Sequence, residues 1–232
     1  KENGVLLLPL KDDNPVVHVR FQYVTVGIMA VCVLMYVWQL SLPLSDAAAL
    51  LYNLGAIPGA FAGEAATVRD TTLPVFLTAI SHMFVHADFM HLAGNLMFLW
   101  VFGDNIEDEL GHGRFLVFYL FCGLLALLTH GLVTSDMQMP VVGASGAISG
   151  ILAAYLMLHP HARVLVLAFV PFPIRMPTYM ALGLWAVFNL ASGLVDIRGE
   201  DAVAWWTHIG GFVAGLIGLQ LFGWRGKQSE LA

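Results

Sequence analysis

Charged side chains are scarce in this chain. Of its 232 residues, 11% are charged and 59% are hydrophobic, whereas about 25% of the residues in an ordinary soluble domain are charged. A soluble fold of this length has too small a core to hide so much apolar surface. The composition therefore excludes an ordinary soluble protein and indicates a protein of the lipid bilayer.

Basic residues and cysteines are also few. Ten Lys and Arg against sixteen Asp and Glu leave a net charge of −6, which lacks the basic footprint that nucleic-acid binding needs. Cys32 and Cys122 both lie within apolar runs, which favours two buried thiols over a disulfide. We therefore expect no nucleic-acid partner and no disulfide.

Long apolar runs predict membrane-spanning helices. A helix needs about 20 apolar residues to cross a bilayer, because unpaired backbone groups are not tolerated in hydrocarbon. Five charge-free runs are long enough: Phe21–Ser45, Phe115–Ser135, Met137–Ala162, Met176–Val195 and Ala202–Trp224. A sixth run, Phe89–Gly103, becomes adequate if its helix extends from about His86 to Ile106. We predict an all-α membrane protein, a bundle of six transmembrane helices.

The distribution of basic residues predicts the orientation of the bundle. Six spans place both termini on one side, together with eight basic residues: Lys1, Lys11, Arg20, Arg114, Arg163, Arg175, Arg225 and Lys227. Only Arg69 and Arg198 fall on the other side. Because cytoplasmic loops are enriched in Lys and Arg, we expect a cytoplasmic segment 1–20, a membrane domain 21–224 and a cytoplasmic tail 225–232.

Two connections between the predicted spans are unusual. The first outer loop, Asp46–Leu73, is the longest, and a loop of that length is usually functional or seated on the membrane surface. The apolar stretch Val164–Ile174 is too short to span, and it contains Pro171 and Pro173. We predict that this stretch forms a hairpin near the membrane interface.

Polar side chains inside the predicted spans fall into three segments, and each such group needs a partner or a function. The segments are Ser81–His86 continuing to His91 and Asn95, Gly143–Gly146, and His208–Gly211 followed by Gly215. The predicted topology makes these spans run in the same direction, with Ser145 and His208 near their outer ends. At 1.5 Å per residue, Ser145, His208 and the His91/Asn95 helix face share one depth.

These residue types match the needs of acyl transfer, which are a nucleophile, a general base and donors for an oxyanion. Ser145 is the candidate nucleophile and His208 the candidate base. Backbone N–H groups at a helix start point outward, so those of Ala144 and Ser145 can donate to an oxyanion.

Glycines in the same segments favour close packing. Gly143 and Gly146 leave room beside the serine for a carbonyl and for a neighbouring helix. Gly211 and Gly215 form a small-xxx-small face on the last span, which suits tight packing against the serine helix. That packing is expected to bring His208 within hydrogen-bond reach of Ser145.

In combination, these motifs resemble the rhomboid family of intramembrane serine proteases. His86 with His91-Leu-Ala-Gly-Asn95 resembles the family's second-helix pattern, and Gly143–Gly146 resembles its nucleophile motif. His208–Gly215 resembles its sixth-helix pattern, and the second-helix resemblance continues through Phe102–Gly111. Six spans without an additional helix resemble the bacterial form, which implies a multi-pass protein of the bacterial inner membrane.

The resemblance implies a serine endopeptidase that cuts single-span membrane proteins in the outer part of the bilayer. Ser145 would attack the scissile peptide, and His208 would pass the proton to the leaving amine, as a dyad without an acid. His91, Asn95 and the backbone of Ser145 and Ala144 would form the oxyanion hole. No cofactor is implied, the partners are transmembrane substrates and lipid, and the oligomeric state is not predicted.

Two further pairs of residues stand out. His82 and His86 are four residues apart, a spacing that suits a metal site, but we expect them to support the site by hydrogen bonding to the loop instead. Trp185 and Phe188 in the fifth span resemble the family's lateral gate, although lipid-facing aromatic residues explain them as well.

The sequence also departs from the family's pattern. Leu77-Thr78 stands where many members have Trp-Arg, so the first outer loop is anchored differently. Ser149 stands where many members have an aromatic residue that stacks on the base. We therefore expect Trp205 or Trp206 to hold His208, and we do not expect Asp201 to do so.

Three other functions fit parts of the sequence. A metalloprotease needs H-E-x-x-H, which the stretch His86–His91 lacks. A transporter or proton channel using the histidines would not need Ser145, and no inverted repeat is detected. An inactive relative acting as a binding factor usually lacks the serine or the histidine, and here both are present.

Overall fold

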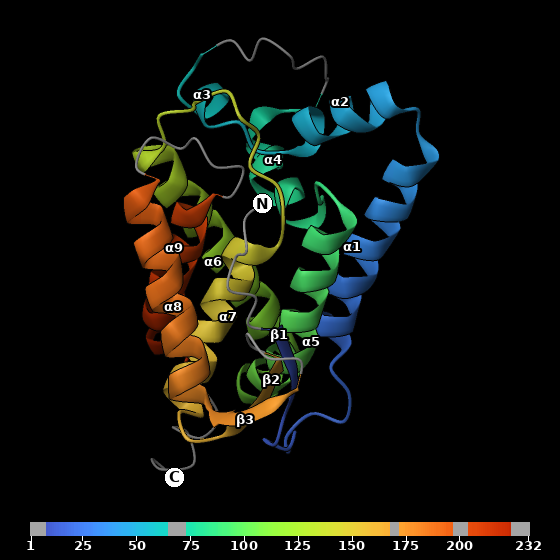
Figure 1. Cartoon of the computed structure of the whole chain (residues 1–232). Coiled ribbons are helices and arrows are strands. Elements are labelled where there is room, and N and C mark those ends of the chain that lie inside the picture. Colours follow the sequence, from blue (N-terminus) through green and yellow to red (C-terminus); the bar gives the residue numbers. More distant parts are fainter. Residues whose placement is uncertain (1–7, 65–72, 168–171, 197–203, 224–232) are drawn as a thin grey trace.

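A bundle of helices with a small sheet at one end forms the described part of the chain (Figure 1). The computed structural model describes residues 8–64, 73–167, 172–196 and 204–223. The helices are α1 (Tyr23–Ser41), α2 (Leu44–Leu54), α3 (Pro58–Phe61), α4 (Val75–Ser81), the 3-10 helix η1 (His82–Phe84), α5 (Phe89–Leu110), α6 (His112–Val133), α7 (Ser145–Leu158), α8 (Thr178–Val195) and α9 (Trp205–Phe222). The strands are β1 (Leu8–Asp12), β2 (Arg163–Leu167) and β3 (Ile174–Pro177).

Three helices within the described residues, α1, α6 and α8, are each long and apolar enough to cross a bilayer. Helices α4–η1 and α5 meet at a bend of 79°, and together they make a fourth span if the bent pair crosses the membrane as one segment. At 14 residues, α7 is shorter than a full crossing. The chain is therefore a mostly helical, multi-pass integral membrane protein, and the count of six spans stays a prediction.

Helix α7 lies at the centre of the bundle, packed against α5, α6 and α9 (yellow in Figure 1). Ten consecutive residues, Gly146–Tyr155, are buried. A helix that is apolar on all sides is expected to be enclosed by others. The outer helices instead expose large apolar side chains such as Leu34 of α1 and Val187 of α8, which suits contact with lipid.

The strands form an antiparallel sheet in the order β1-β2-β3. Strands β2 and β3 pair through Arg163–Pro177 and Val166–Ile174, so they meet at the two ends of the stretch Val164–Ile174 predicted as a hairpin. Strand β1 pairs with β2 through Leu8 and Leu167. The prediction of an all-α protein was therefore wrong at this end, because β1 finds its partner far along the chain, where no local pattern shows it.

Two helix boundaries differ from the predicted spans. The span predicted over Met137–Ala162 becomes helical only at Ser145, because Pro140 lacks an N–H and Gly143 has a φ of +110°. Helix α5 begins at Phe89 rather than near His86, since the Asp88 side chain caps it by accepting from the backbone N–H of His91 at 2.8 Å.

The predicted first outer loop, Asp46–Leu73, is also more ordered than expected. Helix α2 covers its first part and α3 follows, while residues 65–72 lie outside the described part. The carbonyl and N–H groups of Ala56 pair with those of Val141. This bridge ties the connection to the extended strand of chain that leads to Ser145.

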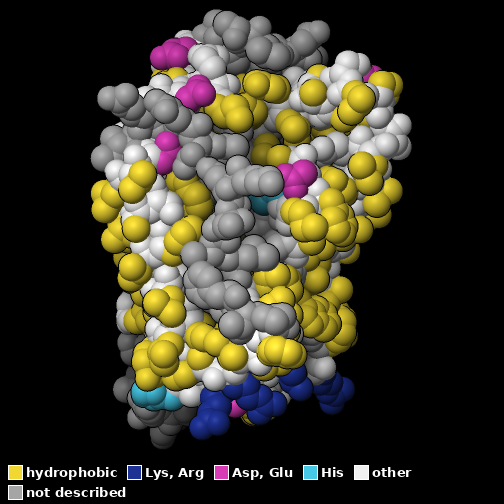
Figure 2. Space-filling view, viewed as in Figure 1, with side chains coloured by type: hydrophobic (Ala, Val, Ile, Leu, Met, Phe, Trp, Pro, Cys, Tyr) yellow, Lys and Arg dark blue, Asp and Glu magenta, His cyan; other side chains and the backbone are white. Residues whose placement is uncertain are grey.

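Basic side chains gather at the end of the molecule that carries the sheet (Figure 2). Lys11, Arg163 and Arg175, one from each strand, line a hollow of about 390 Å³ there. Most acidic side chains visible in the same view lie toward the opposite end. The two ends of the bundle therefore differ in charge, as expected for a protein with a fixed orientation in a membrane.

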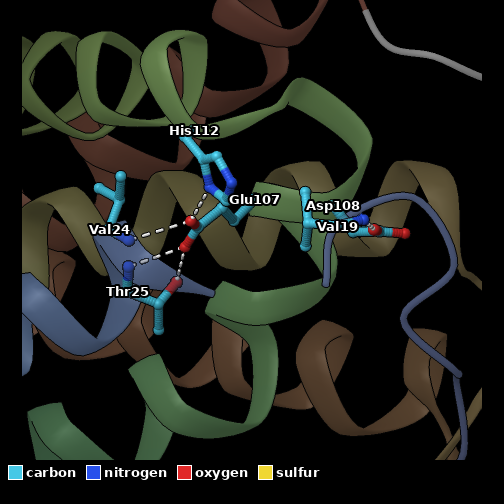
Figure 3. Close-up of polar contacts among 6 residues, drawn as sticks. All are labelled: Val19, Val24, Thr25, Glu107, Asp108 and His112. Atoms are coloured by element: carbon cyan, nitrogen blue, oxygen red, sulfur yellow. Dashed lines mark hydrogen bonds and ion pairs between the residues drawn. The ribbon is translucent and has the colours of Figure 1, made fainter. Parts of the chain in front are cut away.

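Glu107 of α5 joins α1 and α6 near this basic end (Figure 3). Its side chain is fully buried and accepts four hydrogen bonds: from Val24 N at 3.0 Å, Thr25 N at 2.8 Å, Thr25 Oγ1 at 2.7 Å and His112 Nδ1 at 2.5 Å. The neighbouring Asp108 accepts from the backbone N–H groups of residues 17–19 at 2.5–2.9 Å. These two carboxylates fasten the entry of α1 to α5.

Replacing Glu107 with alanine is expected to lower the free energy of unfolding by about 3 kcal/mol, because buried donors lose a charged acceptor. The measurement is thermal unfolding of both proteins in the same detergent. Glu109→Ala, at a half-exposed position of the same helix, serves as the control and should change stability less. Equal unfolding temperatures for the two variants would contradict this role.

Candidate active site

Ser145 and His208 lie side by side in the structure. Ser145 is the first residue of α7, and His208 lies in the first turn of α9. The Nε2 atom of His208 is 2.9 Å from the Oγ atom of Ser145. In a neutral imidazole with its proton on Nδ1, Nε2 accepts the hydroxyl proton. The two candidate catalytic side chains, 63 residues apart, are thus in hydrogen-bond contact.

Glycines allow this contact by letting the backbones of α7 and α9 touch. A Cβ atom at Gly211 would lie 1.9 Å from the carbonyl oxygen of Gly146, and one at Gly215 would lie 2.2 Å from that of Gly150. Any side chain at these positions would push the two helices apart. Gly150 belongs to this contact although the sequence did not single it out.

Helix α7 is packed as closely against α6, which itself packs against α9. A Cβ atom at Gly146 would lie 2.7 Å from Cβ of Ala126, and one at Gly150 would lie 2.4 Å from Sγ of Cys122. Small residues therefore wedge α7 between α6 and α9. This packing holds the start of α7, and with it Ser145, in a defined position.

His91 and Asn95, the side chains proposed for an oxyanion hole, lie against the backbone just before Ser145. A Cβ atom at Gly143 would lie 2.5 Å from Nε2 of His91 and 3.5 Å from Nδ2 of Asn95. Asn95 is 7% exposed, and its Nδ2 has no hydrogen-bond partner among the described residues. A donor that is buried and unpaired is available for a ligand atom. Ala144 is buried and directly precedes α7.

The two remaining predicted histidines flank this region. The Nδ1 atom of His82 lies 3.1 Å from the carbonyl oxygen of Thr78, and the His82 carbonyl accepts from Gly143 N at 2.8 Å. The buried His86 ring packs edge-on against His91, with ring centroids 5.2 Å apart. The expected hydrogen bonding is found for His82 but not for His86, whose ring nitrogens have no hydrogen-bond partner among the described residues. Across the described ranges, no three His, Cys, Asp or Glu side chains are grouped as metal ligands.

The other ring nitrogen of His208 contacts a residue that the sequence did not reveal. Nδ1 of His208 lies 2.6 Å from Oδ1 of Asn189 in α8. The rings of Trp185 and Trp205 also flank His208, each with its centroid 6.1 Å away. Trp205 was expected there, and Asp201 lies outside the described residues. The missed signal was an amide inside an apolar span, which needs a partner.

A cavity of about 700 Å³ opens onto these residues. Ser145, His208, His91 and Asn95 all line it. From the gate candidates Trp185 also lines it, whereas Phe188 packs edge-on against Trp205 with centroids 5.7 Å apart. The cavity is large enough for several residues of an extended peptide or for a small ligand.

The chain is similar in sequence to known proteins. The Rhomboid domain matches residues 74–225 of the chain. Rhomboid protein 1, mitochondrial, from Saccharomyces cerevisiae is 32% identical over 152 residues, which cover 64% of this chain and 41% of the relative. The Rhomboid protease GluP of Bacillus subtilis is 31% identical over 139 residues, covering 60% of this chain and 24% of the relative. The chain spans less than half the length of either relative. Because the Rhomboid domain match covers more than half of this chain, the chain belongs to the rhomboid family.

Proposed function

We propose that this protein is a serine endopeptidase that cleaves transmembrane proteins within the outer part of the bilayer. The observation that carries the proposal is the 2.9 Å contact between Ser145 Oγ and His208 Nε2 in a cavity lined by Asn95. Family membership supports the proposal, since one relative is named a protease. The alternative function, an inactive relative that acts as a binding factor, is not supported by this geometry, because such a protein would have no use for the Ser145–His208 contact.

The proposed reaction begins when Ser145 Oγ attacks the carbonyl carbon of the scissile peptide and His208 Nε2 takes the hydroxyl proton. The carbonyl oxygen becomes an oxyanion, and Asn95, His91 and the backbone N–H groups of Ala144 and Ser145 donate to it. His208 then protonates the leaving amine, and an acyl-enzyme on Ser145 remains. Water attacks the acyl group with His208 again as base, which releases the second product.

The proposed orientation places the sheet end in the cytoplasm and the cavity toward the outer surface. The basic residues Lys11, Arg163 and Arg175 at the sheet end support it. Single-span substrates are expected to approach from the lipid past α8, where Trp185 lines the cavity. We propose a bacterial inner membrane as the location, on the resemblance of the predicted six-span form.

A fluorophosphonate probe tests the proposal, because it phosphonylates a serine only when a base activates the hydroxyl. We expect the detergent-solubilised protein to be labelled on the peptide that contains Ser145, as identified by mass spectrometry. Labelling should vanish in Ser145→Ala and persist in Ser149→Ala, whose hydroxyl donates to the Ser145 carbonyl at 2.7 Å. A folded wild-type protein that stays unlabelled would favour a binding factor over a protease.

A further inference from the structure

We propose that Asn189 is a positioning residue that fixes the tautomer and the ring orientation of His208. The inference deepens the proposed protease function and rests on it for its kinetic consequence. Asn189 lies in α8, is 3% exposed and meets the base on the side away from Ser145. The three side chains form a line from the Asn189 amide through the imidazole to the serine hydroxyl.

The direction of the Asn189 amide follows from its second contact. Its Nδ2 atom lies 2.8 Å from the carbonyl oxygen of Trp185, one turn earlier in α8. A carbonyl oxygen only accepts, so the amide NH₂ group must face Trp185 and the amide oxygen must face His208. The α8 backbone thereby orients the amide.

The tautomer of His208 follows in turn. Because Oδ1 of Asn189 can only accept, Nδ1 of His208 must carry the proton across the 2.6 Å contact. The unprotonated Nε2 atom then faces Ser145 Oγ at 2.9 Å, which is the form that a general base requires. The opposite tautomer would direct an N–H at the hydroxyl and could not take its proton.

The contact also strengthens as the reaction proceeds. When His208 takes the serine proton, the ring becomes an imidazolium and its Nδ1–H becomes a charge-assisted donor to the amide oxygen. Position 149, on the helix of the nucleophile, has no aromatic ring that could stack on His208, because it is a serine whose hydroxyl donates to the carbonyl of Ser145. Asn189 therefore orients His208 in place of such a ring.

The decisive variants are Asn189→Leu, which keeps the size but loses the acceptor, and Asn189→Asp, which keeps an acceptor at the same place. We expect Asn189→Leu to lower kcat for a transmembrane substrate by about 10- to 100-fold, the loss typical of a hydrogen bond to a charged group. KM should stay unchanged in Asn189→Leu. The kcat of Asn189→Asp should lie at or above the midpoint between the Asn189→Leu and wild-type values on a logarithmic scale. Leu190→Ala, on the exposed side of the same turn, is the matched control and should retain kcat.

A readout independent of proteolysis is the ¹⁵N NMR signal of the His208 ring in protein labelled at histidine. We expect a protonated Nδ1 in the wild type and a mixture of tautomers in Asn189→Leu. A kcat within twofold of wild type in Asn189→Leu, or an unchanged tautomer, overturns the inference. The inference is also overturned if Asn189→Leu and Asn189→Asp lose kcat equally and both have a lower unfolding temperature, because Asn189 would then serve only the packing of the helices. If the wild-type protein shows the expected tautomer but cleaves no substrate, the positioning role of Asn189 stands and the proposed protease function is refuted.

Discussion

Replacing His208 with alanine is expected to lower the rate of substrate cleavage by about 10⁴- to 10⁶-fold, the range found when a serine hydrolase loses its base. The reason is that Nε2 of His208 is the group in contact with Ser145 Oγ. Without it the hydroxyl keeps its proton and is a poor nucleophile. Labelling by the fluorophosphonate probe should fall in parallel with cleavage, because both reactions need the same deprotonated oxygen.

Two measurements make the His208 result interpretable. His161→Ala, at an exposed histidine beyond the end of α7, should leave both rates unchanged. Thermal unfolding of His208→Ala in detergent must show a protein that is still folded at the assay temperature, because removing this hydrogen-bonded side chain costs some stability. Cleavage that persists within tenfold of wild type would show that another group takes the proton.

Replacing Gly211 with alanine is expected to lower the same activity by about 10²-fold, although it changes neither side chain of the dyad. The added Cβ would lie 1.9 Å from the carbonyl oxygen of Gly146, which is backbone and has no rotamer to change. Helices α7 and α9 must therefore separate, and with them Ser145 and His208. A displacement of about 1 Å at reacting groups costs about 10²-fold in rate, and overpacking costs roughly 1–3 kcal/mol of stability.

Gly27→Ala is the matched control for Gly211. It adds the same methyl group in α1, where no atom lies within 4 Å of the new Cβ. The helix interior should become more stable by about 0.5–1 kcal/mol, with unchanged cleavage. The unfolding temperatures of the two variants should thus move in opposite directions, and probe labelling should fall only in Gly211→Ala. Full labelling of Gly211→Ala would mean that the helices have room to spare.

Depth along the membrane made Ser145 and His208 predictable. Parallel spans of predicted direction place residues at one level from sequence position alone, and the polar groups that need partners then stand out. The same reasoning would have found Asn189, which precedes the end of α8 by six residues, much as His208 follows the start of α9. The amide was overlooked because the aromatic residues beside it drew the gate interpretation.

Other features were beyond prediction for physical reasons. The pairing of Leu8 with Leu167 is set by tertiary contacts, and five residues that contain Pro9 carry little strand signal. The late start of α7 depends on the positive φ of Gly143, which the sequence permits but does not impose. Helix α2 within the first outer loop was likewise hidden, because its apolar and polar residues fit a surface loop equally well.

The shortness of α7 has a consequence for the second half of the proposed reaction. Its 14 residues rise about 21 Å, while the hydrocarbon core is about 30 Å thick. The stretch 137–144 before Ser145 is not helical, and its backbone pairs in part with Ala56, Gly59 and His82. Irregular backbone at membrane depth is tolerated where it is buried in protein or lines a water-filled cavity, and residues 139–142 line the cavity that reaches Ser145. In the proposed orientation, the helix that carries the serine thus stops beside a cavity through which water can reach the acyl group. The proposed hydrolysis of the acyl-enzyme in the outer part of the bilayer depends on that supply of water.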